Sequence, residues 1–277
     1  MESRKITIAD IQAKKNTHQK ITMLTAYDFP LAALLDQAGL DMILVGDSVA
    51  NVVLGLESTT QVGMVEMLHH AKAVRRAVKT ALIIGDMPFE SYQAAPQDAV
   101  KNARRFIDEA GCDAVKLEWF EKCPEVTQEI VKAQIPVMGH IGLTPQTAAQ
   151  LGGFKVQGKD AEAAKRLIAQ AKLLDELGCF SIVLECVPDK VAQIITQQLK
   201  IPTIGIGAGV YCDGQVLVTH DMLGLFERYK PKFVKQYVNL SAQILAAINK
   251  FKEEVEASEF PDAEHSFSIK QEELNKL

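Results

Sequence analysis

The sequence has 277 residues, of which 48% are hydrophobic and 23% charged, and its formal net charge is −5. This balance is typical of a globular protein, and the length suits one large α/β domain or one eight-stranded barrel of roughly 250 residues. The small negative charge, without a long block of Lys and Arg, argues against a nucleic-acid-binding face.

Cysteine usage and the apolar runs indicate the compartment. The five cysteines are odd in number and form no C-x-x-C pair, so we expect reduced thiols and neither a disulfide nor a zinc framework. The N-terminus lacks an apolar core long enough for a signal peptide, and no apolar run approaches the roughly 20 residues of a membrane span. We therefore expect a cytoplasmic protein that contacts no membrane.

Strands and helices alternate along the chain. A short helix is predicted over 7–15, where it could close the bottom of a barrel. Eight strands are predicted after it. In chain order they are 20–28, three runs that end at Asp47, Asp86 and Glu118, then 136–143, a run that ends at Glu185, 202–209 and 215–223. Pro30 at a first turn and Gly39 at the end predict a helix over 30–39. Apolar residues at three-four spacing predict helices over 62–78, 96–111 and 160–178, and a closing helix is predicted over 230–252. This order predicts a (β/α)₈ barrel.

One short pattern recurs in these strands: a glycine, an apolar run, then a carboxylate seven or eight residues later. It runs from Gly39 to Asp47, from Gly111 to Glu118 and from Gly178 to Glu185, and a fourth run ends in Asp86 without the leading glycine. A glycine just past a helix accepts positive φ cheaply, and an unbroken apolar run suits a parallel strand covered on both faces. The pattern therefore predicts the end of a helix, then a buried strand, then an acidic residue at the carboxyl end of that strand.

The acidic strand ends are candidates for a site. In such a barrel the chemistry lies at the carboxyl ends of the strands, so Asp47, Asp86, Glu118 and Glu185 would meet there. Carboxylates brought together require a cation, shared protons or a catalytic use. An oxygen-rich, open set of ligands suits Mg²⁺. Alternatively, each acid is only a helix cap or the partner of a loop ion pair.

Three further residues are candidates for substrate contacts. Lys116 stands two residues before Glu118 and should share its face of the strand, where it could bind a carboxylate or keto oxygen. The alternative is a structural ion pair with Asp86 or Glu118. Ser48 could donate to an anionic substrate or serve only as a turn residue. His140 could donate to a substrate oxygen or be a satisfied structural histidine.

Six segments agree in length, order and spacing with one known enzyme family. They are LTAYD (24–28), LVGDS (44–48) with Asn51 and Gly55, GDMPF (85–89) with Ser91 and Tyr92, VKLE (115–118), VMGHIGLTPQ (137–146) and IGIGAG (204–209). From about residue 3 to residue 267 the chain resembles the 3-methyl-2-oxobutanoate (ketopantoate) hydroxymethyltransferases. The last ten residues show no such resemblance.

The resemblance implies a fold and an activity. The fold would be a (β/α)₈ barrel of the phosphoenolpyruvate/pyruvate-binding type. The reaction would transfer a hydroxymethyl group from 5,10-methylenetetrahydrofolate to 3-methyl-2-oxobutanoate, giving 2-dehydropantoate for pantothenate and coenzyme A synthesis. It also implies one Mg²⁺ per subunit and a homo-oligomer, typically a decamer. We expect a single catalytic domain over 1–267 and a flexible tail over 268–277.

The resemblance also implies roles for individual residues. Those that match the family's metal site are Asp47, Asp86 and Glu118. Those that match its oxo-acid contacts are Asp47, Ser48, Asp86 and Lys116, to which we add His140 as a further substrate contact. Glu185 matches its catalytic base. The reaction would pass through an enolate stabilised by Mg²⁺ and Lys116.

Two other functions remain open at this point. A Mg²⁺-dependent oxo-acid lyase of the same barrel superfamily would turn over without folate. A non-catalytic barrel that binds an oxo acid would show binding without proton exchange at the substrate.

Overall fold

A computed structural model of the chain describes residues 4–148, 153, 155–226, 228 and 230–277. The chain forms two compact units, one of Met1–Thr219 with Pro231–Val234 and one of His220–Lys230 with Lys235–Leu277. Within the described residues, no helix has both the length and the apolar character needed to cross a membrane. The expected boundary between the catalytic domain and a tail at 267/268 stays a prediction.

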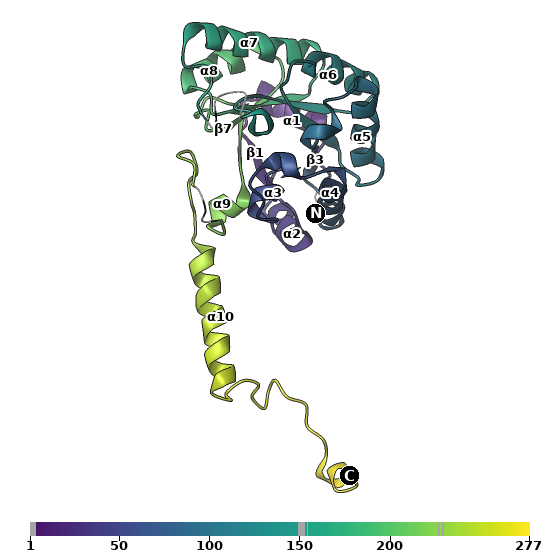
Figure 1. Cartoon of the computed structure of the whole chain (residues 1–277), viewed down its shortest axis with the longest axis vertical. Helices are drawn as coiled ribbons and strands as arrows, with labels where there is room; N and C mark the ends of the chain where they lie inside the picture. Colours follow the sequence, from purple (N-terminus) through teal and green to yellow (C-terminus); the bar gives the residue numbers. More distant parts are fainter. Residues whose placement is uncertain (1–3, 149–152, 154, 227, 229) are drawn as a thin grey trace. The chain divides into compact units, whose positions relative to one another are not determined.

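Eight parallel strands close into a barrel in the first unit, each paired with its neighbours in chain order, and β8 paired with β1 (Figure 1). The strands are β1 Ile21–Thr25, β2 Met42–Val45, β3 Leu82–Asp86, β4 Ala114–Glu118, β5 Val137–Gly142, β6 Ser181–Glu185, β7 Thr203–Ile206 and β8 Gly214–Leu217. The predicted (β/α)₈ barrel is confirmed.

Helices connect the strands and continue beyond them. They are α1 Ile8–Asn16, α2 Phe29–Gln37, α3 Val49–Val52, α4 Met64–Ala77, α5 Pro96–Asp108, α6 Cys123–Lys132, α7 Ala161–Glu176, α8 Asp189–Gln198, α9 Thr219–Leu223, α10 Leu240–Glu256 and α11 Gln271–Leu274. Short 3₁₀ turns lie at Thr59–Gln61, Phe89–Ser91 and Pro145–Thr147. The helices around the sheet, including α6 and α8, bury apolar faces on the outside of the barrel.

Several predicted ranges are wrong at their ends. The seventh strand, predicted over 202–209, spans only Thr203–Ile206. The first strand ends at Thr25, and the side chain of Asp28 caps α2 by accepting the N–H of Leu31 at 2.8 Å. The last strand ends at Leu217 and is followed by α9, not by more strand. The helix predicted over 230–252 begins only at Leu240, because the side chain of Asn239 caps it by accepting the N–H of Ala242.

The glycines that lead the repeated pattern take the conformation that the pattern requires. Gly39, Gly111 and Gly178 follow α2, α5 and α7 with φ of 76°, 70° and 93°. Positive φ at this point turns the chain out of the helix at little steric cost. The chain can therefore enter the next strand directly.

The N-terminal helix α1 closes the bottom of the barrel, as its place in the sequence predicts. Ile11 is fully buried and joins the apolar cluster inside the barrel. Lys14 and Lys15 form ion pairs with Asp41 and Asp213, which stand at the starts of β2 and β8. The barrel interior is thus sealed at the end opposite the acidic strand termini.

Candidate active site

Strand register places the predicted site residues on neighbouring strands at one end of the barrel. Asp86 on β3 pairs with Lys116 on β4, and Glu118 on β4 pairs with His140 on β5. Glu185 on β6 pairs with Gly142 on β5. Because all strands are parallel, these side chains belong to the carboxyl end of the sheet, where barrels of this kind place their chemistry.

A buried ion pair forms the centre of this group. Lys116 Nζ lies 2.7 Å from Asp86 Oδ1, and both side chains are almost fully buried. The other oxygen, Oδ2, accepts the backbone N–H of Asp47 at 3.1 Å. The ion pair that the sequence leaves open as an alternative for Lys116 is therefore present, and both of its members are among the residues that the resemblance assigns to the oxo acid.

His140 lies between the ion pair and the two glutamates. Its Nδ1 is 3.4 Å from Lys116 Nζ and 3.5 Å from Glu118 Oε1. Its Nε2 is 3.2 Å from Glu185 Oε2, which makes an ion pair when the ring is protonated. His140 therefore connects the predicted base to the Lys116 group through its ring.

Burial and mutual charge shift the acid–base behaviour of this group. Burial raises the pKa of Asp86 from 3.8 to about 7, with Lys116 opposing the change and Asp47 and Glu118 adding to it. Burial lowers the pKa of Lys116, but the neighbouring carboxylates outweigh it and raise that pKa, so the ammonium stays charged. Burial and Lys116 lower the pKa of His140, yet Glu118 and Glu185 raise it to about 9.

The chain turns sharply around Glu185. Gly142 has φ 98°, and a Cβ there would lie 2.2 Å from the carbonyl oxygen of Glu185. Cys186 has φ 50°, which costs a non-glycine residue on the order of 1–3 kcal/mol. The Glu185 side chain is 15% exposed, against 5% or less for Lys116 and Asp86, so solvent or substrate reaches it more easily than the ion pair.

Asp47 and Ser48 begin the turn after β2. Asp47 is buried, and its Oδ2 accepts a hydrogen bond from Gln146 Nε2 at 2.8 Å. Ser48 is half-buried, and its Oγ lies 2.8 Å from the hydroxyl of Tyr27. The two residues thus enter the site from β2, on the side of Asp86.

Sequence reasoning assigns no role to two buried residues of the site. Gln146, in the 3₁₀ turn after β5, donates its backbone N–H to Glu118 Oε2 at 3.0 Å, in addition to its bond to Asp47. Its Oε1 accepts a hydrogen bond from the hydroxyl of Tyr92. Burial, followed by the nearby carboxylates, raises the pKa of Tyr92 well above its ordinary value, so this hydroxyl stays a donor. Both residues lie within the segments that carry the family resemblance, which is the one signal that could have found them.

The donor set fits Mg²⁺. Four carboxylates face one lysine and one histidine, and this excess of negative charge in a buried site favours a divalent cation. Among the described residues, no three His, Cys, Asp or Glu side chains form a preformed metal cage. Mg²⁺ rarely needs one, because it keeps several waters and takes one or two carboxylates with the substrate. The metal role of Asp47, Asp86 and Glu118 stays a prediction.

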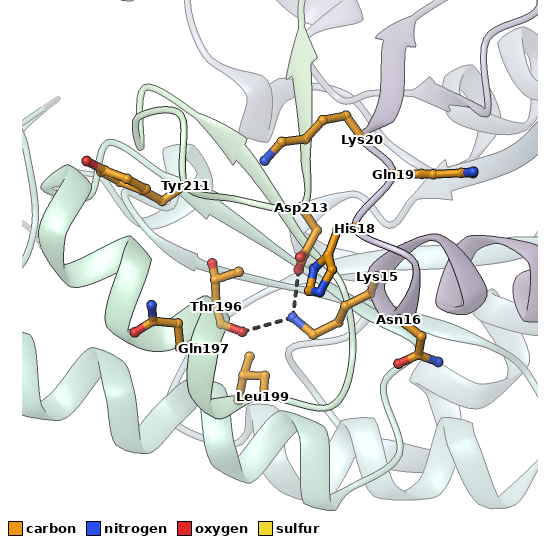
Figure 2. A pocket seen from close by; sticks show the side chains of 10 residues that line it. All are labelled: Lys15, Asn16, His18, Gln19, Lys20, Thr196, Gln197, Leu199, Tyr211 and Asp213. Atoms are coloured by element: carbon orange, nitrogen blue, oxygen red, sulfur yellow. Dashed lines mark hydrogen bonds and ion pairs between the residues drawn. The ribbon is translucent and has the colours of Figure 1, made fainter.

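A cavity of about 590 Å³ opens at the other end of the barrel (Figure 2). Lys15 lies within it, where its Nζ bonds the carbonyl of Thr196 at 2.9 Å and Asp213 at 2.8 Å. Its wall combines mostly polar side chains of the loops before β1 and β8 with residues at the ends of α1 and α8. It holds none of the strand-end carboxylates, so we place the chemistry at the buried group and not here.

Several solved structures share this fold. A phosphonopyruvate hydrolase aligns with a TM-score of 0.63 at 12% identity, covering 98% of this chain and 94% of its own. A 2,3-dimethylmalate lyase of the PEP mutase/isocitrate lyase superfamily aligns with a TM-score of 0.60 at 13% identity, covering 97% and 93%. At this identity the likeness shows the fold alone.

Sequence comparison identifies the family. The family model described as ketopantoate hydroxymethyltransferase matches residues 5–263. A 3-methyl-2-oxobutanoate hydroxymethyltransferase of Syntrophomonas wolfei is 55% identical over 99% of both chains. One from Moorella thermoacetica is 56% identical over 95% of this chain and 98% of its own. The chain therefore belongs to the ketopantoate hydroxymethyltransferase family of enzymes, as its sequence motifs predict.

Proposed function

We propose that the protein transfers a hydroxymethyl group from 5,10-methylenetetrahydrofolate to 3-methyl-2-oxobutanoate, forming 2-dehydropantoate for pantothenate and coenzyme A synthesis. The observation that carries the proposal is the buried Lys116–Asp86 pair, joined through His140 to the more accessible Glu185. A fixed cation beside an accessible carboxylate is what proton removal next to a ketone requires.

Proton removal is the first step. Glu185 takes the proton from C3 of the oxo acid, and the electron pair moves onto the keto oxygen to form an enolate. Lys116 stays charged, so its ammonium can donate a hydrogen bond to that oxygen. Ser48, Asp86 and His140 would orient the oxo acid.

Carbon–carbon bond formation follows. Water adds to the methylene carbon of the folate in its iminium form, and the resulting hydroxymethyl amine breaks down to formaldehyde and tetrahydrofolate as the C–N electron pair returns to nitrogen. C3 of the enolate then attacks the carbon of formaldehyde, whose oxygen takes up a proton to give the hydroxymethyl product. The iminium is chemistry of the co-substrate, and the protein contributes orientation and exclusion of bulk water.

Asp47, Asp86 and Glu118 would hold one Mg²⁺ per subunit. When bound, this ion would act as a Lewis acid on the carbonyl of the oxo acid. A solved structure of a phosphonopyruvate hydrolase is a complex with oxalate and Mg²⁺, so a barrel of this fold accommodates both groups.

NMR of 3-methyl-2-oxobutanoate in D₂O tests the proposal. With the protein and Mg²⁺ but no folate, we expect loss of the C3 proton signal, and formation of 2-dehydropantoate once methylenetetrahydrofolate is added. Exchange without product after folate addition would favour an oxo-acid lyase. Binding without exchange would favour a non-catalytic barrel.

We also propose that the protein is a cytoplasmic homo-oligomer, a decamer by analogy with its family. The five cysteines are free, which suits a reducing compartment. Within the second unit, α10 buries none of its residues although one of its faces is apolar. Uncovered apolar surface of this kind marks a protein contact.

A further inference from the structure

We propose that Gln146 and Tyr92 form a positioning pair that sets the orientation of the Asp47 and Glu118 carboxylates for Mg²⁺ and the oxo acid. This inference rests on the proposed function, because it assigns a purpose to the metal site there. The hydrogen bonds of the two side chains lead to the Asp47 carboxylate, to each other and to the Met87 carbonyl. The pair would therefore act through the carboxylates.

Gln146 joins the two carboxylates from one position in the turn after β5. Its side-chain Nε2 donates to Asp47 Oδ2 at 2.8 Å, and its backbone N–H donates to Glu118 Oε2 at 3.0 Å. Each carboxylate has two oxygens and about four lone-pair sites. A single donor on one oxygen therefore fixes the direction of the group without exhausting its capacity to bind a cation.

Tyr92 decides which way the Gln146 amide points. Its hydroxyl donates to Gln146 Oε1, and Gln146 Nε2 also donates to the carbonyl of Met87 at 3.2 Å. An amide turned by 180° would bring its oxygen against the Asp47 carboxylate and the Met87 carbonyl, both of which offer only acceptors. The tyrosine hydroxyl thereby keeps the donor end of the amide on Asp47.

Burial makes this arrangement specific. Tyr92 is 1% exposed and Gln146 5% exposed, so water cannot replace a lost donor easily. The ring of Tyr92 is held in turn by Phe120, with ring centroids 5.3 Å apart in an edge-to-face arrangement. Groups that orient metal ligands typically change metal affinity about 10–100-fold when they are removed.

Mg²⁺ titration calorimetry of the full chain tests the pair. For Gln146→Met we expect Mg²⁺ affinity to fall about 10-fold or more, and for Tyr92→Phe, which removes one buried oxygen atom, about 3- to 10-fold. Because Tyr92 acts through Gln146, the double variant should bind Mg²⁺ no more weakly than Gln146→Met alone. Thr147→Val is the matched control, since it removes a buried hydroxyl bonded to Thr144 on the same turn and should leave affinity unchanged.

Thermal unfolding of the same variants separates positioning from a purely structural role. A structural role predicts a lower unfolding midpoint with unchanged Mg²⁺ affinity in the folded protein, and that result would overturn the inference. Additive losses in the double variant would overturn it as well. If Gln146→Met does not fold, Tyr92→Phe still distinguishes a positioning role from a structural one, because it conserves the ring and its packing.

The proposed metal site has its own control. Asp86→Ala should lose Mg²⁺ binding. If the unsubstituted protein binds no Mg²⁺, or Asp86→Ala binds it normally, the metal site of the proposed function fails and the inference fails with it. If Asp86→Ala loses binding while Gln146→Met and Tyr92→Phe keep it, only the inference is wrong.

Discussion

Glu185 differs from the other carboxylates of the site in its surroundings. Asp47, Asp86 and Glu118 each accept a hydrogen bond from a protein donor or lie in an ion pair. Glu185 also faces a cation, since its Oε2 lies 3.2 Å from His140 Nε2, but its side chain is 15% exposed, against 5% or less for Lys116 and Asp86. A carboxylate that solvent and substrate can reach suits a general base.

For Glu185→Gln we predict that oxo-acid and Mg²⁺ binding persist while C3-proton exchange falls about 10²–10⁴-fold, the usual contribution of a general base. The amide keeps the size of the side chain but cannot accept the proton. NMR exchange in D₂O measures the rate, and calorimetry measures binding on the same sample. Exchange at the unsubstituted rate would exclude Glu185 as the base.

The raised pKa of Asp86 predicts how Mg²⁺ affinity depends on pH. Burial, reinforced by Asp47 and Glu118 against the opposing effect of Lys116, raises that pKa to about 7. A protonated carboxyl binds metal poorly, so Mg²⁺ affinity should fall about tenfold for each pH unit below 7 and level off above it. Calorimetry across this range is the measurement, and a flat profile would contradict Asp86 as a ligand.

The raised pKa of Asp86 also predicts how the stability of the metal-free protein changes with pH. The native state keeps a proton on Asp86 that the unfolded chain releases between pH 3.8 and about 7. Since the native state then binds more protons, the contribution of Asp86 to the free energy of unfolding falls as pH rises through this window. Added Mg²⁺ should reverse part of that loss above pH 7.

At the scale of single elements, the carboxyl ends of β5 and β6 are held together where the backbone of Gly142 lies close to the backbone of Glu185. Gly142 faces the carbonyl of Glu185 so closely that no side chain fits between them. The next residue, Leu143, donates its N–H to that same carbonyl at 2.8 Å. The position of Glu185 therefore depends on a glycine in the neighbouring strand.

For Gly142→Ala we predict a loss of about 3–5 kcal/mol in the free energy of unfolding, because the Cβ would overlap the Glu185 carbonyl. Gly39→Ala is the control, since Gly39 also has positive φ, at 76°, but its Cβ would meet nothing within 4 Å. That change should lower the free energy of unfolding by only about 1–2 kcal/mol, the cost of positive φ for a residue with a Cβ. Equal losses in urea denaturation would show that the overlap is relieved by backbone movement.

At the scale of the whole molecule, α10 carries an apolar face that its own unit does not cover. Its members recur at helical spacing and are 45–59% exposed: Ile244, Leu245, Ile248, Phe251 and Val255. Apolar residues aligned on one side of a helix are expected to be buried. A second copy of the chain is the partner that the proposed homo-oligomer supplies.

For Ile248→Glu we predict a smaller assembly than the decamer expected of the unsubstituted protein, because a charge in an apolar contact is costly to desolvate. Ala246→Glu adds the same charge on the opposite side of α10 and should leave the mass unchanged. Light scattering after size-exclusion chromatography measures both. If the two variants have the same mass as the unsubstituted protein, the α10 face is not the contact.

Much of the architecture is predictable because it repeats. Gly39, Gly111 and Gly178 each end a helix, and the apolar runs after them each form a buried strand. The long apolar periodicity of α4, α5 and α7 is likewise readable in the sequence. The closing helix begins later than its apolar residues predict, since residues 230–239 also carry apolar side chains but the cap that starts α10 is Asn239.

The sequence by itself determined the barrel, the family and the acidic strand ends, because strand–helix alternation and carboxylates after apolar runs are local patterns. Only the tertiary structure decided which atoms of these groups contact each other and which further residues join them. Gln146 reaches Asp47 across 99 residues of sequence, and His140 comes to lie between Lys116 and Glu185. Such contacts depend on strand register, barrel closure and the turn after β5, and these are set by packing between distant segments.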